Sequence, residues 1–206
     1  MTVLSKLSSS QGRNDDELNK ALGRELVETN NVAGVREIAH NLRNTNKRVQ
    51  IDCLSVLEQV GRLDPGMIED YVAEFIELIF SKENRLVWSS MIDLALIADR
   101  KPKEIFEKYD EIVEVIEKGS VITKDNGIKT LAKVASTSAK YKETIVPYLF
   151  QQLRSCRPKS VPQYAESIQP AVDADSQDEY IDILNTRLID LSEAQQRRVK
   201  KLLKSY

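Results

Sequence analysis

Histidine and cysteine are almost absent from this chain of 206 residues, which contains one of the first and two of the second. Because His40 is the only histidine, a metal site with several imidazole ligands is excluded, and any Ser–His or Cys–His nucleophile must use His40. Cys53 and Cys156 lie far apart and form neither a CxxC pair nor a disulfide framework, which predicts reduced thiols in a cytoplasmic protein. We therefore predict no catalytic residue, no metal and no cofactor, and hence not an enzyme.

Glycine, proline and long apolar runs are also scarce. Seven glycines and six prolines are few for 206 residues, which disfavours strand-rich folds with many tight turns. No apolar run reaches the length of about 18 residues that a membrane span needs, and Met1 to Gly12 do not resemble a signal peptide. Phosphate-binding GxxxxGKS/T and GxGxxG motifs are missing. A net charge of −2 lacks the basic excess expected of a nucleic-acid-binding protein.

What the chain does contain is a spacing of 37 residues between matching apolar positions. One such column holds Val35, Val72, Tyr109, Val146 and Ile183, another holds Ile38, Phe75, Ile112 and Leu149, and a third holds Leu54, Met91, Ile128 and Ala165. A fixed period of this length predicts a repeat array in which each unit buries its apolar face against the next.

Each unit is predicted to be a pair of antiparallel helices. In the clearest unit, apolar residues from Val49 to Val60 have helical spacing and Gly61 ends the first helix. Asp64 and Pro65 then begin a second helix whose apolar stripe runs over 68–79. We expect five such pairs within one domain at 14–206, a flexible N-terminal arm at 1–13, and a C-terminal capping helix over 193–205.

The first helix of the clearest unit resembles that of a HEAT repeat. The resemblance is carried by Asn46, Lys47, Arg48 and Val49, followed by Cys53, Leu54, Leu57, Val60 and Gly61. Arg85 repeats Arg48 in register, whereas Ile122 departs from it, and the consensus residues of tetratricopeptide and ankyrin repeats are missing. The resemblance covers 14–192 and implies an all-α, right-handed α–α superhelix of about five repeats. It also implies that the second helices line the concave surface.

Charge is distributed unevenly along the array. Residues 64–117 contain 6 Lys or Arg and 14 Asp or Glu, whereas residues 118–160 contain 9 and 2. Laying the second helices in register places seven carboxylates on one predicted face: Glu37, Asp70, Glu74, Glu77, Glu107, Glu111 and Glu114. If the resemblance holds, this face lies in a concave groove, where a wall of one sign attracts a cationic ligand. The alternative is that the carboxylates serve only solubility.

One predicted first helix, over 86–98, is apolar on nearly every side. Trp88, Ile92 and Leu96 stand where the neighbouring units have polar residues, which makes them candidate oligomer contacts. Three explanations are open: the N-terminal arm covers this flank, a second copy of the chain covers it in a homodimer, or a modest apolar patch is exposed.

Our leading hypothesis is a non-catalytic binding module or scaffold that holds a basic or amphipathic protein segment in an acidic concave groove. The main alternative is an enzyme, because some compact HEAT-like proteins are DNA glycosylases. Such an enzyme needs basic and aromatic residues in the groove. The central columns are acidic and Trp88 is placed on a first helix, which favours the binding module and a cationic protein or peptide as partner.

Overall fold

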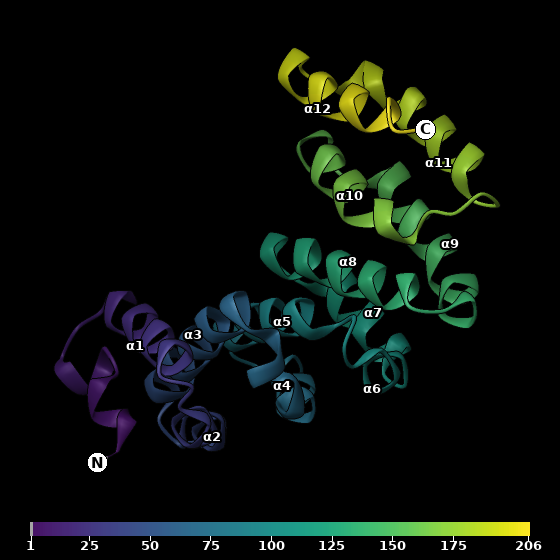
Figure 1. Cartoon of the computed structure of the whole chain (residues 1–206). Coiled ribbons are helices and arrows are strands. Elements are labelled where there is room, and N and C mark those ends of the chain that lie inside the picture. Colours follow the sequence, from purple (N-terminus) through teal and green to yellow (C-terminus); the bar gives the residue numbers. More distant parts are fainter. Residues whose placement is uncertain (1) are drawn as a thin grey trace.

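The computed structural model describes residues 2–206, and its regular structure there is entirely helical. The first helices of successive repeats are α1 (Glu17–Glu28), α3 (Lys47–Leu63), α5 (Asn84–Ile97), α8 (Val121–Ser136) and α10 (Val161–Ile168). The second helices are α2 (Val32–His40), α4 (Val72–Leu78), α6 (Pro102–Phe106) with α7 (Tyr109–Lys118), α9 (Ala139–Ser155) and α11 (Gln177–Arg187). The last helix, α12 (Glu193–Leu203), covers the C-terminal end (Figure 1). The predicted all-α superhelix of two-helix repeats is confirmed.

Side-chain caps explain where many of these helices begin. The side-chain oxygens of Asn46, Ser120 and Ser138 accept hydrogen bonds from backbone N–H groups in the first turns of α3, α8 and α9. Each cap satisfies one of the N–H groups that a helix start leaves without an intrahelical partner. Among residues 2–206 there is no helix long and apolar enough to cross a membrane.

The 37-residue columns form the core. Val35, Val72, Val146 and Ile183 are all buried, and so are Ile38, Phe75, Ile112 and Leu149 of the neighbouring column. Tyr109 is half-buried and is the exception in its column. Equivalent positions of successive second helices therefore meet the same continuous core, as the period predicts.

Two of the second helices are interrupted, which the sequence did not predict. The stretch expected as one helix over 65–79 consists of two short 3-10 helices, η4 (Pro65–Met67) and η5 (Glu69–Tyr71), followed by α4. Tyr71 has φ −97° and ψ 17°, and Lys108, one period later, has φ −112° and ψ 20°. Both conformations leave the α-helical region. The break therefore recurs with the repeat and divides each of these second helices into two segments.

The first helices lie on the inner side of the bend. Figure 1 shows the array turning between α5 and α10, with α1, α3, α5, α8, α10 and α12 inside the turn and the second helices outside it. Neighbouring first helices contact each other extensively, whereas neighbouring second helices contact each other much less. A layer that packs closely becomes the short, inner side of a curved array. The expectation that the second helices line the concave surface is therefore wrong.

The segment expected as an N-terminal arm packs on the first repeat. It forms η1 (Val3–Lys6) and η2 (Ser9–Gln11), and between them Leu7 is fully buried. The backbone N–H of Ser8 donates to Asn19 Oδ1 at 2.9 Å, and that of Ser9 donates to Asp52 Oδ2 at 2.7 Å. Figure 1 shows this segment at the N-terminal end, beside α1 and α2, so it does not cover α5. Met1 lies outside the described residues, and the boundary after residue 13 stays a prediction.

Candidate binding surface on the second helices

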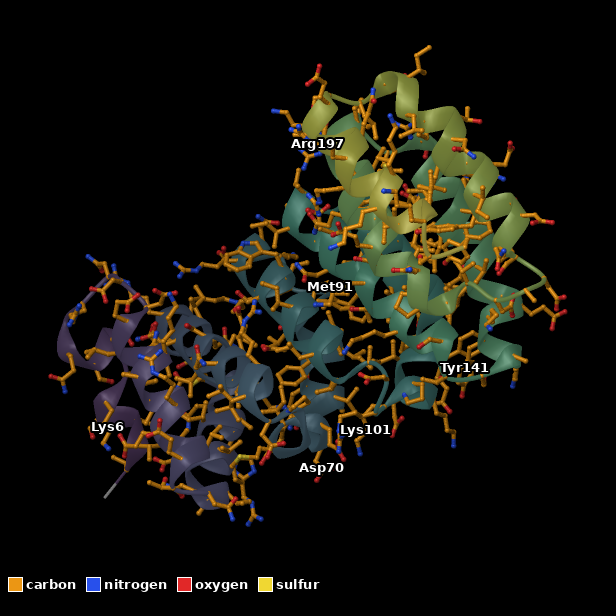
Figure 2. All side chains as sticks on the ribbon, turned by 45° about the horizontal axis from the view of Figure 1, so that its top comes forward. Lys6, Asp70, Met91, Lys101, Tyr141 and Arg197 are labelled. Atoms are coloured by element: carbon orange, nitrogen blue, oxygen red, sulfur yellow. The ribbon has the colours of Figure 1, made fainter. Side chains whose placement is uncertain are left out.

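The helix breaks divide the seven predicted carboxylates into groups. Asp70 and Glu107 precede the breaks, whereas Glu74, Glu77, Glu111 and Glu114 follow them on α4 and α7. Because a break ends the helical register, the seven do not share one continuous helix face. They lie on the outer layer of the array, and Figure 2 shows Asp70 near Lys101, whose Nζ is 3.1 Å from Asp70 Oδ1.

Glu37 is engaged by the N-terminal segment. Its Oε2 accepts the backbone N–H of Val3 at 3.2 Å, and its Oε1 accepts the hydroxyl of Thr2. The carboxylate thus anchors η1 to α2.

Each of the other six carboxylates has a cation beside it. Arg43 Nη2 lies 3.3 Å from Glu77 Oε2 and 3.7 Å from Glu74 Oε1, so one guanidinium serves both. The remaining neighbours are Lys101 for Asp70, Lys103 for Glu107, Lys108 for Glu111 and Lys118 for Glu114. The hydrogen bond from Lys108 holds the pKa of Glu111 below its ordinary value. The surface therefore carries positive and negative side chains in ion pairs, with more carboxylates than cations, and is not uniformly negative.

Three cavities open along the ends of the second helices. The first has a volume of about 290 Å³ and lies between η3 (Asn41–Arg43) and α4. The central one, about 500 Å³, lies between the ends of α4 and α7. The third, about 460 Å³, lies between the ends of α7 and α9 and the starts of α8 and α10. Because the array bends toward the first helices, the second helices spread apart, and this spread leaves room for the cavities.

The four carboxylates on α4 and α7 line the first two cavities. Glu74 and Glu77 belong to the first cavity, with Leu42, Leu78 and Arg43, and Glu111 and Glu114 belong to the central one, with Val115, Val87 and Phe80. Phe80 is 48% exposed, so its ring is available at the mouth of the central cavity. These apolar residues could not be identified from the sequence, because each one alone looks like an ordinary surface position.

The third cavity has a different chemistry. Lys124, Asp125, Arg157 and Tyr164 line it, and no carboxylate of the predicted seven does. Burial raises the pKa of Asp125 and of the Tyr164 phenol. Arg157 Nε donates to Ser160 Oγ at 2.9 Å, which holds the guanidinium at the cavity wall.

The apolar helix α5 is mostly covered by its neighbours. It packs between α3 and α8 and against α4, which leaves Trp88, Ile92 and Leu96 half-buried. The Leu96 side chain lies against Gly61 of α3. Packing within the chain therefore accounts for most of the apolar character that the sequence left unexplained, and the oligomer contact stays a prediction.

Three observations on the described residues bear on catalysis. Within 2–206, no cluster of three or more His, Cys, Asp or Glu side chains could hold a metal ion. Burial raises the pKa of the Cys53 thiol to about 12 and also raises that of Cys156, which disfavours the reactive thiolate form of both. His40 is exposed at the end of α2.

The fold belongs to the class of HEAT-like helical repeat solenoids. No protein-family model matches the chain, and no curated protein matches it. Among solved structures, an engineered protein of the Northeast Structural Genomics Consortium has a TM-score of 0.68 at 18% identity, covering 99% of this chain and 96% of its own.

Two further solved structures are similar in fold. A designed armadillo repeat protein, YIII(Dq.V1)4CPAF, in complex with peptide (KR)4, has a TM-score of 0.66 at 13% identity, covering 98% of this chain and 90% of its own. Kap121p has a TM-score of 0.66 at 17% identity, covering 89% of this chain, which spans only 21% of Kap121p. At these identities the likeness extends to the fold alone.

Proposed function

We propose that this chain is a non-catalytic scaffold that binds a basic or amphipathic protein segment through the ends of its second helices. The observation that carries the proposal is the placement of Glu74, Glu77, Glu111 and Glu114 at two neighbouring cavities. Carboxylates beside apolar hollows match a segment that presents both cations and apolar side chains. The acidic excess of residues 64–117 adds a longer-range attraction for such a segment.

The ion pairs on this surface do not oppose the proposal. They are solvent-exposed, and exposed pairs contribute only about 0–1 kcal/mol each. A Lys or Arg of a partner can therefore replace an intramolecular cation at little cost. Designed armadillo repeat protein YIII(Dq.V1)4CPAF, which is similar in fold, is in complex with peptide (KR)4, which supports a basic segment as the ligand here.

The test is the binding of a Lys- and Arg-rich peptide, followed by fluorescence anisotropy over a range of salt concentrations. Binding should weaken as salt rises, because the Debye length falls from about 10 Å at 0.1 M to about 3 Å at 1 M. Changing Glu74, Glu77, Glu111 and Glu114 together to Gln should weaken binding about tenfold, chiefly through slower association.

A matched control neutralises four exposed carboxylates on first helices and on α12: Glu17, Glu28, Glu166 and Glu193, each changed to Gln. The control variant has the same net charge as the first and should keep most of the affinity. Equal losses in the two variants, or tight binding of duplex DNA with no binding of cationic peptides, would contradict the proposal.

A further inference from the structure

The three cavities are the same site repeated. Leu42, Arg43 and Gln50 of the first cavity stand one period of 37 residues before Ile79, Phe80 and Val87 of the central one. On the opposite walls, Glu74, Glu77 and Leu78 are followed at the same interval by Glu111, Glu114 and Val115. The third cavity continues the series, because Glu117, Lys124 and Gln152 stand one period after Phe80, Val87 and Val115. The period that builds the core therefore also builds a row of three equivalent cavities.

Two replacements between the first two cavities decide what each can bind. In the first cavity Arg43 places its guanidinium 3.3 Å from Glu77 and 3.7 Å from Glu74, so that a cation of the chain already lies against both carboxylates. In the central cavity Phe80 takes the place of Arg43, and Val87 takes the place of Gln50. Glu111 and Glu114 remain, each paired only with a Lys of α7 or its preceding turn. Lys82 and Lys118 line the same cavity, so its two carboxylates are balanced, whereas the first cavity holds two carboxylates and only the one cation Arg43. The central cavity is therefore the more apolar of the two and has no excess of negative charge.

The third cavity lacks the two carboxylates that the first and central cavities share. Tyr148 and Gln151 occupy the positions of Glu111 and Glu114, and Lys124 occupies the position of Val87. Its two carboxylates are restrained, because Glu117 accepts hydrogen bonds from Tyr148 Oη at 3.0 Å and Gln152 Nε2 at 2.7 Å, and Asp125 is half-buried. Lys124 and Arg157 then oppose a cation at this end of the row.

We propose that the row binds one extended protein segment, with an apolar side chain in the central cavity and a Lys or Arg at the first cavity only. This inference rests on the proposed function and specifies which side chains of the bound segment each cavity recognises. Packed neighbouring helices lie about 8–10 Å apart, and the second helices spread apart on the outer side of the bend, so this distance is a lower limit. Because an extended chain advances about 3.3 Å per residue, successive cavities accept side chains about three or four residues apart. The recognised pattern is a cation and an apolar residue at that spacing, with no cation on the far side.

The test is an array of synthetic peptides in which three positions, separated by two Ser residues in one set and by three in another, hold every combination of Lys, Leu and Gln. Because the direction of the bound chain is not fixed by the cavities, both orders of each combination are included. Lys and Leu at neighbouring positions, with Gln at the far end, should bind about tenfold tighter than the same peptide with Gln in place of Leu. A second Lys beyond the Leu should add no affinity.

Substitutions between equivalent positions test the assignment of each cavity. Phe80→Arg recreates the Arg43 arrangement in the central cavity and should abolish the preference for Leu, whereas Ile189→Arg, at a side chain 88% exposed elsewhere, should not. Arg43→Phe should create a second apolar cavity, so that peptides with two neighbouring Leu residues gain affinity. Lys124→Glu should make a second Lys favourable, whereas Lys140→Glu, at an exposed position outside the row, should not.

The outcomes separate this inference from the proposed function. Salt-sensitive binding of Lys-rich peptides with no preference for Leu, or a Leu preference that survives Phe80→Arg, would overturn the row of cavities and leave the scaffold proposal intact. Absence of binding by every cationic peptide, even at low salt, would overturn both. Circular dichroism confirms that each variant is folded, which is expected because Phe80, Arg43 and Lys124 are not buried.

Discussion

Asp93 is the residue at which this chain departs most from its own repeat. The equivalent positions one period away hold Val56 and Thr130, which suit a buried site between first helices. Asp93 is also fully buried, and neither of its carboxyl oxygens has a hydrogen-bond partner among residues 2–206. Burial raises its pKa well above the ordinary value, Glu58 raises it further, and only Arg62 opposes them. Burial therefore favours the neutral form of this carboxyl group over the charged one.

We predict that Asp93→Thr stabilises the protein at neutral pH. The hydroxyl of Thr130, at the equivalent position one period later, donates to the Asn126 carbonyl one turn earlier at 2.9 Å. A Thr at position 93 would be able to make the same kind of hydrogen bond, so its hydroxyl would not be left without a partner. Removing a buried group without partners should gain about 1–3 kcal/mol in the free energy of unfolding, measured by urea denaturation at pH 7.

The same substitution should change the pH dependence. Because the pKa of Asp93 is higher in the folded state than in the unfolded state, its contribution to stability is greatest below the unfolded value of 3.8. That contribution is lost as pH rises from the unfolded pKa through the folded one. Denaturation between about pH 4 and pH 8 should show a smaller decline in stability for Asp93→Thr than for the wild type. Parallel profiles would show that Asp93 is ionised in the folded protein.

At the scale of the element, one arginine caps the C-terminal end of a helix in the preceding repeat. Arg187, in the last turn of α11, is only 8% exposed and reaches the end of α9. Its Nη1 donates to the carbonyl oxygens of Leu153 and Arg154 at 2.8 and 2.6 Å, and its Nη2 donates to that of Cys156 at 2.8 Å. A helix end leaves its last carbonyl groups without intrahelical donors, and a guanidinium satisfies several at once. Arg187 thus fastens the last two repeats together.

We predict that Arg187→Lys lowers the free energy of unfolding by about 2–4 kcal/mol, because an ammonium cannot reproduce the planar fork and leaves buried carbonyl groups without donors. Chemical denaturation measures the loss, and amide hydrogen exchange should locate faster opening at the C-terminal turn of α9. Arg197→Lys, at an exposed position on α12, is the matched control and should have little effect. Equal stability of the two variants would contradict the capping role.

How far the elements could be predicted depends on whether their cause restricts the residue types in the sequence. Val35 and its column were predictable because burial imposes the same apolar requirement in every unit. The breaks at Tyr71 and Lys108 were not, because neither residue type disfavours a helix strongly and the backbone change has no signal of its own. Arg187 was equally hidden, because its acceptors are backbone carbonyl groups more than thirty residues away.

At the scale of the whole molecule, curvature is the property that the sequence did not reveal. It depends on the small difference in spacing between two layers of helices, and the residues of either layer satisfy the same apolar pattern. The consequence for the site is large, because the bend spreads the second helices and opens the cavities that Glu74, Glu77, Glu111 and Glu114 line. Four of the seven predicted carboxylates thus lie at cavities, on the outer rather than the inner surface.

The inner surface leads to a prediction about assembly. The half-buried side chains of Trp88, Ile92 and Leu96 belong to α5, one of the helices inside the bend. A homodimer through α5 would cover the area that these side chains still expose, and a charge placed there would remain without a partner in the interface. Changing both Ile92 and Leu96 to Lys should convert a dimer to a monomer in analytical ultracentrifugation, with an unchanged helical circular dichroism spectrum.

Lys substitutions at Val121 and Ile122, which are 43% exposed at the start of α8, are the matched control and should leave the assembly intact. A wild-type chain that sediments as a monomer at high concentration would rule the homodimer out, because stable interfaces bury about 800 Å² on each partner and would hold at such concentrations.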